Sequence, residues 1–314
     1  MRTRAAALAT DDFVEQIASS ELARSRSAVA AVVAGFFAAA GAYADVLLGP
    51  LTLLVAGVGS GGRVFDGRLR QPGLGTRRPR GFVSEQVPVA SRVALPTSIA
   101  ALTVALAYDQ RATLTAVARF GAKAAADRGS AERARLLERV ASVGPAALTE
   151  SSFVRPLLHL ASPSEGGLLS PADFVATEDI ASEAQERSLD GVTWLEAPWA
   201  EALPEVGSGG ERHAICAVDA EGVYATLCYE RVGTGLAVPA LGLVAALGAV
   251  PVRRGERRVS PGERLPSAAP IAIACDDAGA PIEATATFQA GPHAKKSHLS
   301  VARGSGRWVI ATRH

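Results

Sequence analysis

Residues 27–44 contain no charged side chain, and this segment constrains the fold more than any other feature of the chain. A helix over these residues would have no polar face, so it must lie inside a large core or inside a membrane. A bilayer-spanning helix needs about 20 predominantly apolar residues. Alanine and glycine supply most of this segment, Asp45 closes it, and Gly49-Pro50 interrupts the apolar run that follows. We therefore predict a buried helix in a layered domain, followed by one or two buried strands within 46–58.

The charge balance and the cysteines exclude several classes of protein. The chain has 32 basic and 31 acidic residues, so its net charge of +1 offers no surplus of cations for a nucleic-acid backbone. Its cysteines, Cys216, Cys228 and Cys275, lack CxxC pairing and a histidine at metal-ligand spacing. The N-terminal segment lacks an apolar signal-peptide core. We expect a cytoplasmic protein with no metal, no cofactor, and no nucleic-acid or membrane partner.

The hydrophobic period changes along the chain. Helical spacing predicts two packed helices within 96–126, a helix over 130–143 and helical character in 151–160. Ser170 is expected to cap a short element that begins at Pro171.

A stretch rich in glycine, with Pro204, marks the best internal boundary, at 201–211. Beyond it, 214–229 predict a hairpin with Gly222 where a positive φ is needed, and 270–288 repeat the pattern. Helices over buried strands, followed by meandering strands, fit a layered α+β domain.

Short motifs in a fixed order carry a family resemblance over most of the chain. They are Phe65-Asp66-Gly67-Arg68, and the segments 93–102, 166–173, 218–222, 235–239 and 265–270. With the Ala-rich segment ahead of them, they resemble the γ-glutamyltransferase (γ-glutamyltranspeptidase) family of N-terminal-nucleophile hydrolases, in a shortened and degenerate form. The resemblance implies an α+β fold, a four-layer α-β-β-α sandwich. Residues 1–206 would correspond to the large subunit and 207–314 to the small subunit, together forming one folded domain.

The resemblance also locates the position of the family's nucleophile. In an active member, a threonine heads the small subunit just before the Val-Asp-x-x-Gly hairpin, and self-cleavage frees the α-amine that activates its hydroxyl. When the family motif is aligned without gaps on 218–222, this position falls on Arg212, between Glu211 and His213. None of these three residues can be that nucleophile.

The positions that hold the substrate carboxylate are partly retained. Arg68 matches the carboxylate-binding arginine of the family, although Leu69 stands where a glutamate follows it. The family's pair of serines corresponds to Pro266 and Ser267, so one hydroxyl of two remains. The resemblance therefore implies a residual carboxylate site of Arg68 and Ser267. The alternative is that Arg68 pairs with a local acid, of which Asp66 is the nearest in sequence.

The oxyanion donors of the family are displaced in this chain. The glycine pair that supplies them falls near Gln289 and Ala290, with Gly291 one step further on. Loss of one preorganised oxyanion donor costs about two to three orders of magnitude in rate.

Three residues provide alternatives to a missing nucleophile. Ser208 would head a cleaved subunit if the register slips, Cys216 would act as a displaced nucleophile, and His213 would serve either of them as a base. These alternatives require an active γ-glutamyl transferase or amidohydrolase of glutathione-like substrates, with self-cleavage near Ser208.

The first hypothesis is a catalytically inactive γ-glutamyltransferase-like protein, a pseudoenzyme of glutathione metabolism. It would be retained to bind a small γ-glutamyl or carboxylate ligand or to assemble, for example as a homo-oligomer.

Overall fold

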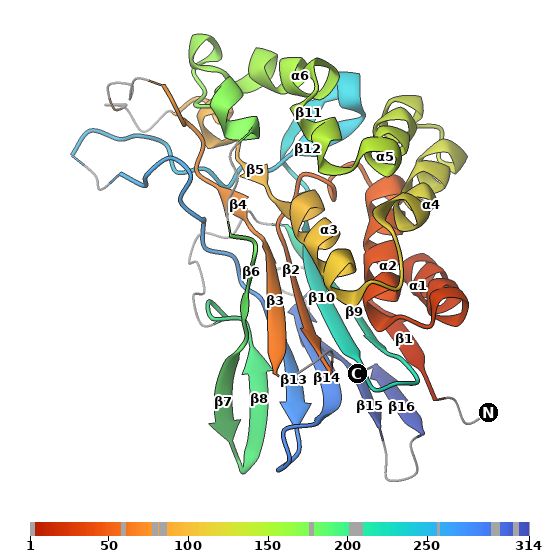
Figure 1. Ribbon diagram of the computed structural model, residues 1–314. Helices are drawn as coiled ribbons and strands as arrows, with labels where there is room; N and C mark the ends of the chain where they lie inside the picture. Colours follow the sequence, from red (N-terminus) through yellow and green to blue (C-terminus); the bar gives the residue numbers. More distant parts are fainter. Residues whose placement is uncertain are drawn as a thin grey trace.

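The computed structural model describes residues 4–57, 61–76, 81, 87–175, 179–200, 210–255, 258–289, 296–303 and 308–313. The α-helices of this part all precede residue 162 (Figure 1). They are α1 (Asp12–Ser25), α2 (Ala28–Ala42), α3 (Ser98–Asp109), α4 (Leu114–Asp127), α5 (Ala131–Val143) and α6 (Ser151–Ala161).

The first large sheet is antiparallel and has the strand order β1-β9-β10-β2-β3-β6. Its strands come from both ends of the chain, because β1 pairs with β9 and β2 pairs with β10. The strands are β1 (Ala6–Ala9), β2 (Leu51–Ala56), β3 (Gly62–Gly67), β6 (Ala181–Glu183), β9 (Glu211–Val218) and β10 (Tyr224–Arg231).

The second large sheet has the strand order β16-β15-β14-β13-β8-β7 and is also antiparallel. Its strands are β7 (Gln185–Leu189), β8 (Val192–Glu196), β13 (Ile271–Cys275), β14 (Pro281–Gln289), β15 (Lys296–Arg303) and β16 (Val309–Arg313). Two short ribbons complete the strands, β4 (Leu69–Arg70) with β5 (Leu95–Pro96) and β11 (Leu236–Val238) with β12 (Leu243–Ala245).

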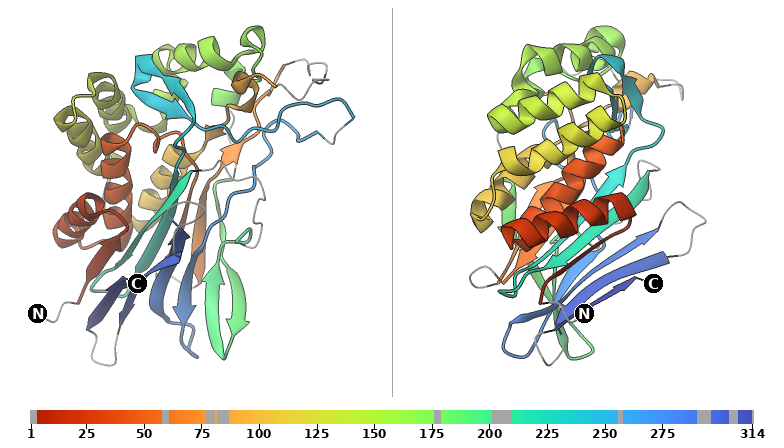
Figure 2. Two further views of the ribbon diagram at one scale, coloured as in Figure 1. Left: turned by 180° about the vertical axis from the view of Figure 1, so that it is seen from behind. Right: turned by 90° about the vertical axis from the view of Figure 1, so that its right-hand side faces the viewer.

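The layers are helices, first sheet and second sheet, in that order (Figure 2). Helix α2 packs on β9 and β10 from one side, while β14 packs on the same strands from the other. The expected α+β sandwich is therefore confirmed. In the described part of the chain, no α-helix covers the outer face of the second sheet, so the fourth layer stays a prediction.

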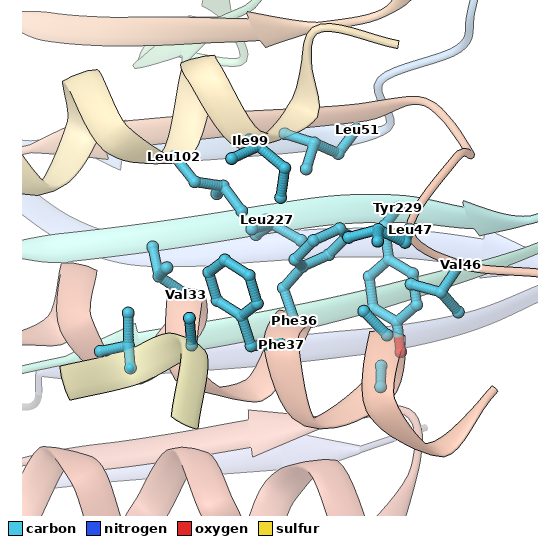
Figure 3. Close-up of a cluster of buried hydrophobic side chains, with 14 of the residues drawn as sticks. Val33, Phe36, Phe37, Val46, Leu47, Leu51, Ile99, Leu102, Leu227 and Tyr229 are labelled. Carbon is cyan, nitrogen blue, oxygen red and sulfur yellow. The ribbon is translucent and has the colours of Figure 1, made fainter. Parts of the chain in front are cut away.

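Helix α2 is the uncharged segment, and every one of its residues is buried. Ser27 caps its N-terminus by accepting a hydrogen bond from the Ala30 amide at 2.9 Å. Phe36 packs edge-on against Phe37 and against Tyr229 of β10, with ring centroids 5.9 and 5.8 Å apart (Figure 3). Among the described residues, no helix has the length and hydropathy required to cross a bilayer.

The predicted turns and caps are present. The hairpin β9–β10 turns at Gly222, whose φ is +97°. Ser170 and Asp173 form a reciprocal capping box at the start of the 3₁₀ helix η4 (Pro171–Phe174). The boundary predicted between residues 206 and 207 lies outside the described residues.

Candidate functional site

The position expected for the nucleophile lies in β9, directly opposite Glu230 of β10. Side chains alternate along a strand, so Arg212 shares a face with Ala214 and Cys216, which pack toward the second sheet. Burial raises the pKa of Glu230, and the Arg212 guanidinium opposes that shift. The Glu230 carboxylate also accepts a hydrogen bond from the Gly210 amide at 3.2 Å. An ionised base with no hydroxyl or thiol therefore occupies this point of the sheet.

His213 faces the opposite side of the first sheet. Its ring stacks on Tyr229, with centroids 5.4 Å apart, and Tyr229 belongs to the core beneath the helices. Its Nδ1 lies 3.0 Å from the Thr10 hydroxyl, and Nε2 lies 3.7 Å from the Glu211 carboxylate. Burial lowers the pKa of the imidazole. The sheet therefore separates His213 from the face that carries Arg212, and it is not placed to serve as a base there.

Cys216 is unsuited to nucleophilic attack. The thiol is buried, and burial raises its pKa to about 12. Its sulfur lies 3.2 Å from the Thr226 hydroxyl, inside the layer between the two sheets. A nucleophilic cysteine requires the thiolate, which this environment disfavours. Ser208, the other candidate, lies outside the described residues.

Arg68 follows β3 at the same end of the first sheet. Asp66, Thr52, Cys228 and Ala214 form one row across β3, β2, β10 and β9. Neighbouring strands are about 4.8 Å apart, so Arg68 and Arg212 extend from backbones roughly 14 Å apart. Alternation places both on the face toward the second sheet.

Asp66 pairs with Arg68 in a forked arrangement. Arg68 Nε lies 3.0 Å from Asp66 Oδ1, and Nη2 lies 2.8 Å from Oδ2. The guanidinium lies flat over Trp199, 4.0 Å from the ring centroid. Arg264 approaches the same carboxylate at 3.6 Å. The local pairing that the sequence raised as an alternative is therefore present, although it uses only the Nε and Nη2 edge of Arg68.

Ser267 lies in the segment that follows Arg264. The Leu265 amide donates to the Leu69 carbonyl at 2.9 Å, so this segment runs beside β4 and next to Arg68. Ser267 itself is half-buried, and the described contacts do not join its hydroxyl to Arg68. The structure brings the two chain segments together without bringing these two side chains into contact.

The expected oxyanion position lies at the end of β14. Gln289 is the last residue of that strand, and Ala290 and Gly291 lie outside the described residues. In the described part of the chain, no group of three or more His, Cys, Asp and Glu side chains is placed to hold a metal ion.

Trp199, Arg264 and Glu230 were not identified from the sequence as neighbours of the site. Arg264 directly precedes the Leu265-Pro266-Ser267 motif, which is the signal that could have pointed to it. Trp199 and Glu230 carry no comparable signal, because only strand pairing and sheet packing bring them to Arg68 and Arg212.

Comparisons with known proteins find a likeness in structure only. No protein-family model matches the chain, and no curated protein matches it in sequence. A structure of a LmbA2991 variant is 13% identical, with a TM-score of 0.76, over 99% of this chain and 96% of that one. A cephalosporin acylase from Bacillus halodurans is 11% identical, with a TM-score of 0.65, over 99% of this chain and 94% of that one. The predicted relationship to N-terminal-nucleophile hydrolases of the γ-glutamyltransferase type is confirmed at the level of the fold.

Proposed function

We propose that this chain is a non-catalytic relative of the N-terminal-nucleophile hydrolases, of the γ-glutamyltransferase type. It binds a small γ-glutamyl or other carboxylate ligand, or serves in assembly, and does not hydrolyse its ligand. The observation that carries the proposal is Arg212 at the start of β9, opposite Glu230. A guanidinium stays protonated at all physiological pH values, so it supplies neither a nucleophile nor a base.

Two neighbouring features support the absence of chemistry. His213 is packed on the helical side of the first sheet, and the Cys216 thiol is buried with a raised pKa. The chemistry of this fold depends on a hydroxyl or thiol next to its own free α-amine, and such an amine exists only after self-cleavage.

The purified 314-residue chain is expected to release no detectable product from γ-glutamyl anilides. Denaturing mass spectrometry of the same sample should give one species near 32.2 kDa. The variant Arg212→Thr should remain inactive, because Gln289 and Ala290 stand where the oxyanion glycines are needed.

The contrary outcome is defined by Ser208. Two fragments from cleavage near that residue, together with turnover that disappears in Ser208→Ala, would establish an active transferase or amidohydrolase in place of this proposal.

The binding part of the proposal rests on Arg68. Asp66 occupies one edge of the guanidinium, and Nη1 points away from that pairing, so a second carboxylate can be met without breaking the first. Titration calorimetry with glutamate, glutamine or glutathione should detect binding that Arg68→Ala weakens by roughly 1.5–3 kcal/mol, as for a hydrogen bond to a charged group.

Arg63→Ala is the matched control for this titration. Arg63 lies on the same strand, and its partner Glu183 is 3.7 Å away at an exposed position. The control should leave ligand affinity unchanged. Absence of heat at millimolar ligand would remove the carboxylate site and leave assembly as the proposed role.

A further inference from the structure

An apolar cavity of about 320 Å³ lies on the other side of Thr97 from the Asp66–Arg68 pair. Its walls come from the segment after α2, from β5 and the start of α3, from the 3₁₀ helix η2 (Gly144–Thr149), from α6 and from η4. These elements meet near the top of the molecule as drawn in Figure 1. Neither Arg68 nor Arg212 lines the cavity.

The floor of the cavity is buried and its mouth is open. Leu47, Leu48, Leu95 and Phe153 line the floor and are at most 6% exposed. At the mouth, the side chain of Val175 is 65% exposed. A large apolar residue at the entrance of an apolar cavity is typical of a route by which an apolar molecule enters from solvent.

The anionic group in the wall is committed to the backbone. The Asp173 carboxylate accepts hydrogen bonds from the amides of Gly73, Leu74 and Ser170 at 2.8–3.0 Å. Its backbone carbonyl accepts a further hydrogen bond from Arg70 Nη2 at 2.9 Å. The formal charges of Arg70 and Asp173 cancel, so the wall carries no net charge for an ionic ligand.

The hydroxyl groups in the wall are also engaged. Thr97 donates to the Asp66 carbonyl and Thr149 donates to the Ala146 carbonyl, each at 2.9 Å. A ligand that enters this cavity therefore meets hydrocarbon on most sides and gains little from polar groups of its own. A charged ligand would lose its hydration without compensation.

The volume sets the size of the ligand. A cavity of about 150 Å³ lined by aliphatic and aromatic residues holds one benzene ring. The present cavity is about twice as large. We propose that it binds a small uncharged apolar molecule, or an uncharged apolar group of a larger one, of about the size of two fused aromatic rings. This inference is independent of carboxylate binding at Arg68 and of the absence of catalysis.

The probe for this cavity is 1-naphthol, with 1-naphthoate as its charged counterpart. Titration calorimetry of the full chain should show saturable binding of 1-naphthol at one site. Binding of 1-naphthoate should be at least about tenfold weaker, because its charge would be buried without a partner. Equal or tighter binding of 1-naphthoate would overturn the assignment of an uncharged ligand.

Two variants on α3 test the location. Ala100 lines the cavity, so Ala100→Phe should weaken 1-naphthol binding at least about tenfold by occupying its space. Ala107 is exposed on the same helix, and Ala107→Phe should leave binding unchanged. Unaltered affinity in Ala100→Phe would overturn the proposal.

A measurement on the unaltered chain covers the case in which Ala100→Phe does not fold. Intermolecular nuclear Overhauser effects should connect the ring protons of bound 1-naphthol with the methyl groups of Leu47 and Leu48 in the floor. Effects confined to other methyl groups, or no saturable binding, would place the apolar ligand elsewhere and refute the inference.

Discussion

Replacement of Gly41 by alanine should destabilise the helical layer more than any other single-methyl change in this chain. A Cβ at Gly41 would lie 2.0 Å from the carbonyl oxygen of Gly121 in α4, and 2.7 Å from its carbonyl carbon. These obstacles are backbone atoms, so α2 and α4 would have to separate. Overpacking of this kind costs about 1–3 kcal/mol and occasionally more, and we expect the upper end here. The free energy of unfolding in urea measures the effect.

Gly35→Ala is the control on the same helix. Its Cβ would meet the Ile215 Cδ1 atom at 2.8 Å and the Val14 Cγ1 atom at 3.2 Å, both ends of side chains that can shift. Both substitutions gain about 1 kcal/mol of helix propensity. We expect Gly35→Ala to stay within about 1 kcal/mol of the wild-type stability. Equal losses in the two variants would show that the backbone approach of α2 and α4 is not the cause.

Asp219→Ala is expected to give the second large loss. Asp219 is completely buried at the β9–β10 turn, and its Oδ1 accepts from the amides of Glu221, Gly222 and Val223 at 3.0–3.1 Å. Its Oδ2 receives Arg111 Nη2 at 2.7 Å. Removal of the carboxylate leaves buried donors and a cation without their acceptor, which costs about 3–5 kcal/mol. Denaturant unfolding, followed by far-UV circular dichroism, measures the loss.

Glu221→Ala tests whether burial is the reason. Glu221 also reaches Arg111, at 3.4 Å, but its side chain is 75% exposed. An exposed ion pair contributes at most about 1 kcal/mol, so this variant should be close to wild type. If Asp219→Ala costs no more than Glu221→Ala, the buried carboxylate does not hold the turn, α2 and α3 together.

Parts of the fold with one strong local pattern were predictable from the sequence. The uncharged segment could only be a buried element, and Ser27 and Asp45 bracket it. The hairpin at Gly222 and the capping box at Ser170 depend on residues a few positions apart, so local sequence suffices for them.

Other strands have no such pattern. The expected sandwich began near residue 13, but Ala6–Ala9 forms β1 and completes an edge of the first sheet. Its sequence, Ala-Ala-Leu-Ala, has no strand period, and its partner β9 lies about two hundred residues away. Strand β7 is exposed at every residue, so it has no apolar face to reveal it. These strands exist because a neighbouring strand satisfies their backbone groups.

By itself, the sequence determined which side chains are available at the candidate site. A base stands at Arg212, and Arg68 is retained, whatever the surroundings. Only the tertiary structure decided what these side chains do. It pairs Arg68 with Asp66 over Trp199, sets Glu230 opposite Arg212, and turns His213 to the other face of the sheet. The physical reason is that residue identity limits the chemistry, whereas strand register and the packing of the two sheets determine which groups meet and on which face.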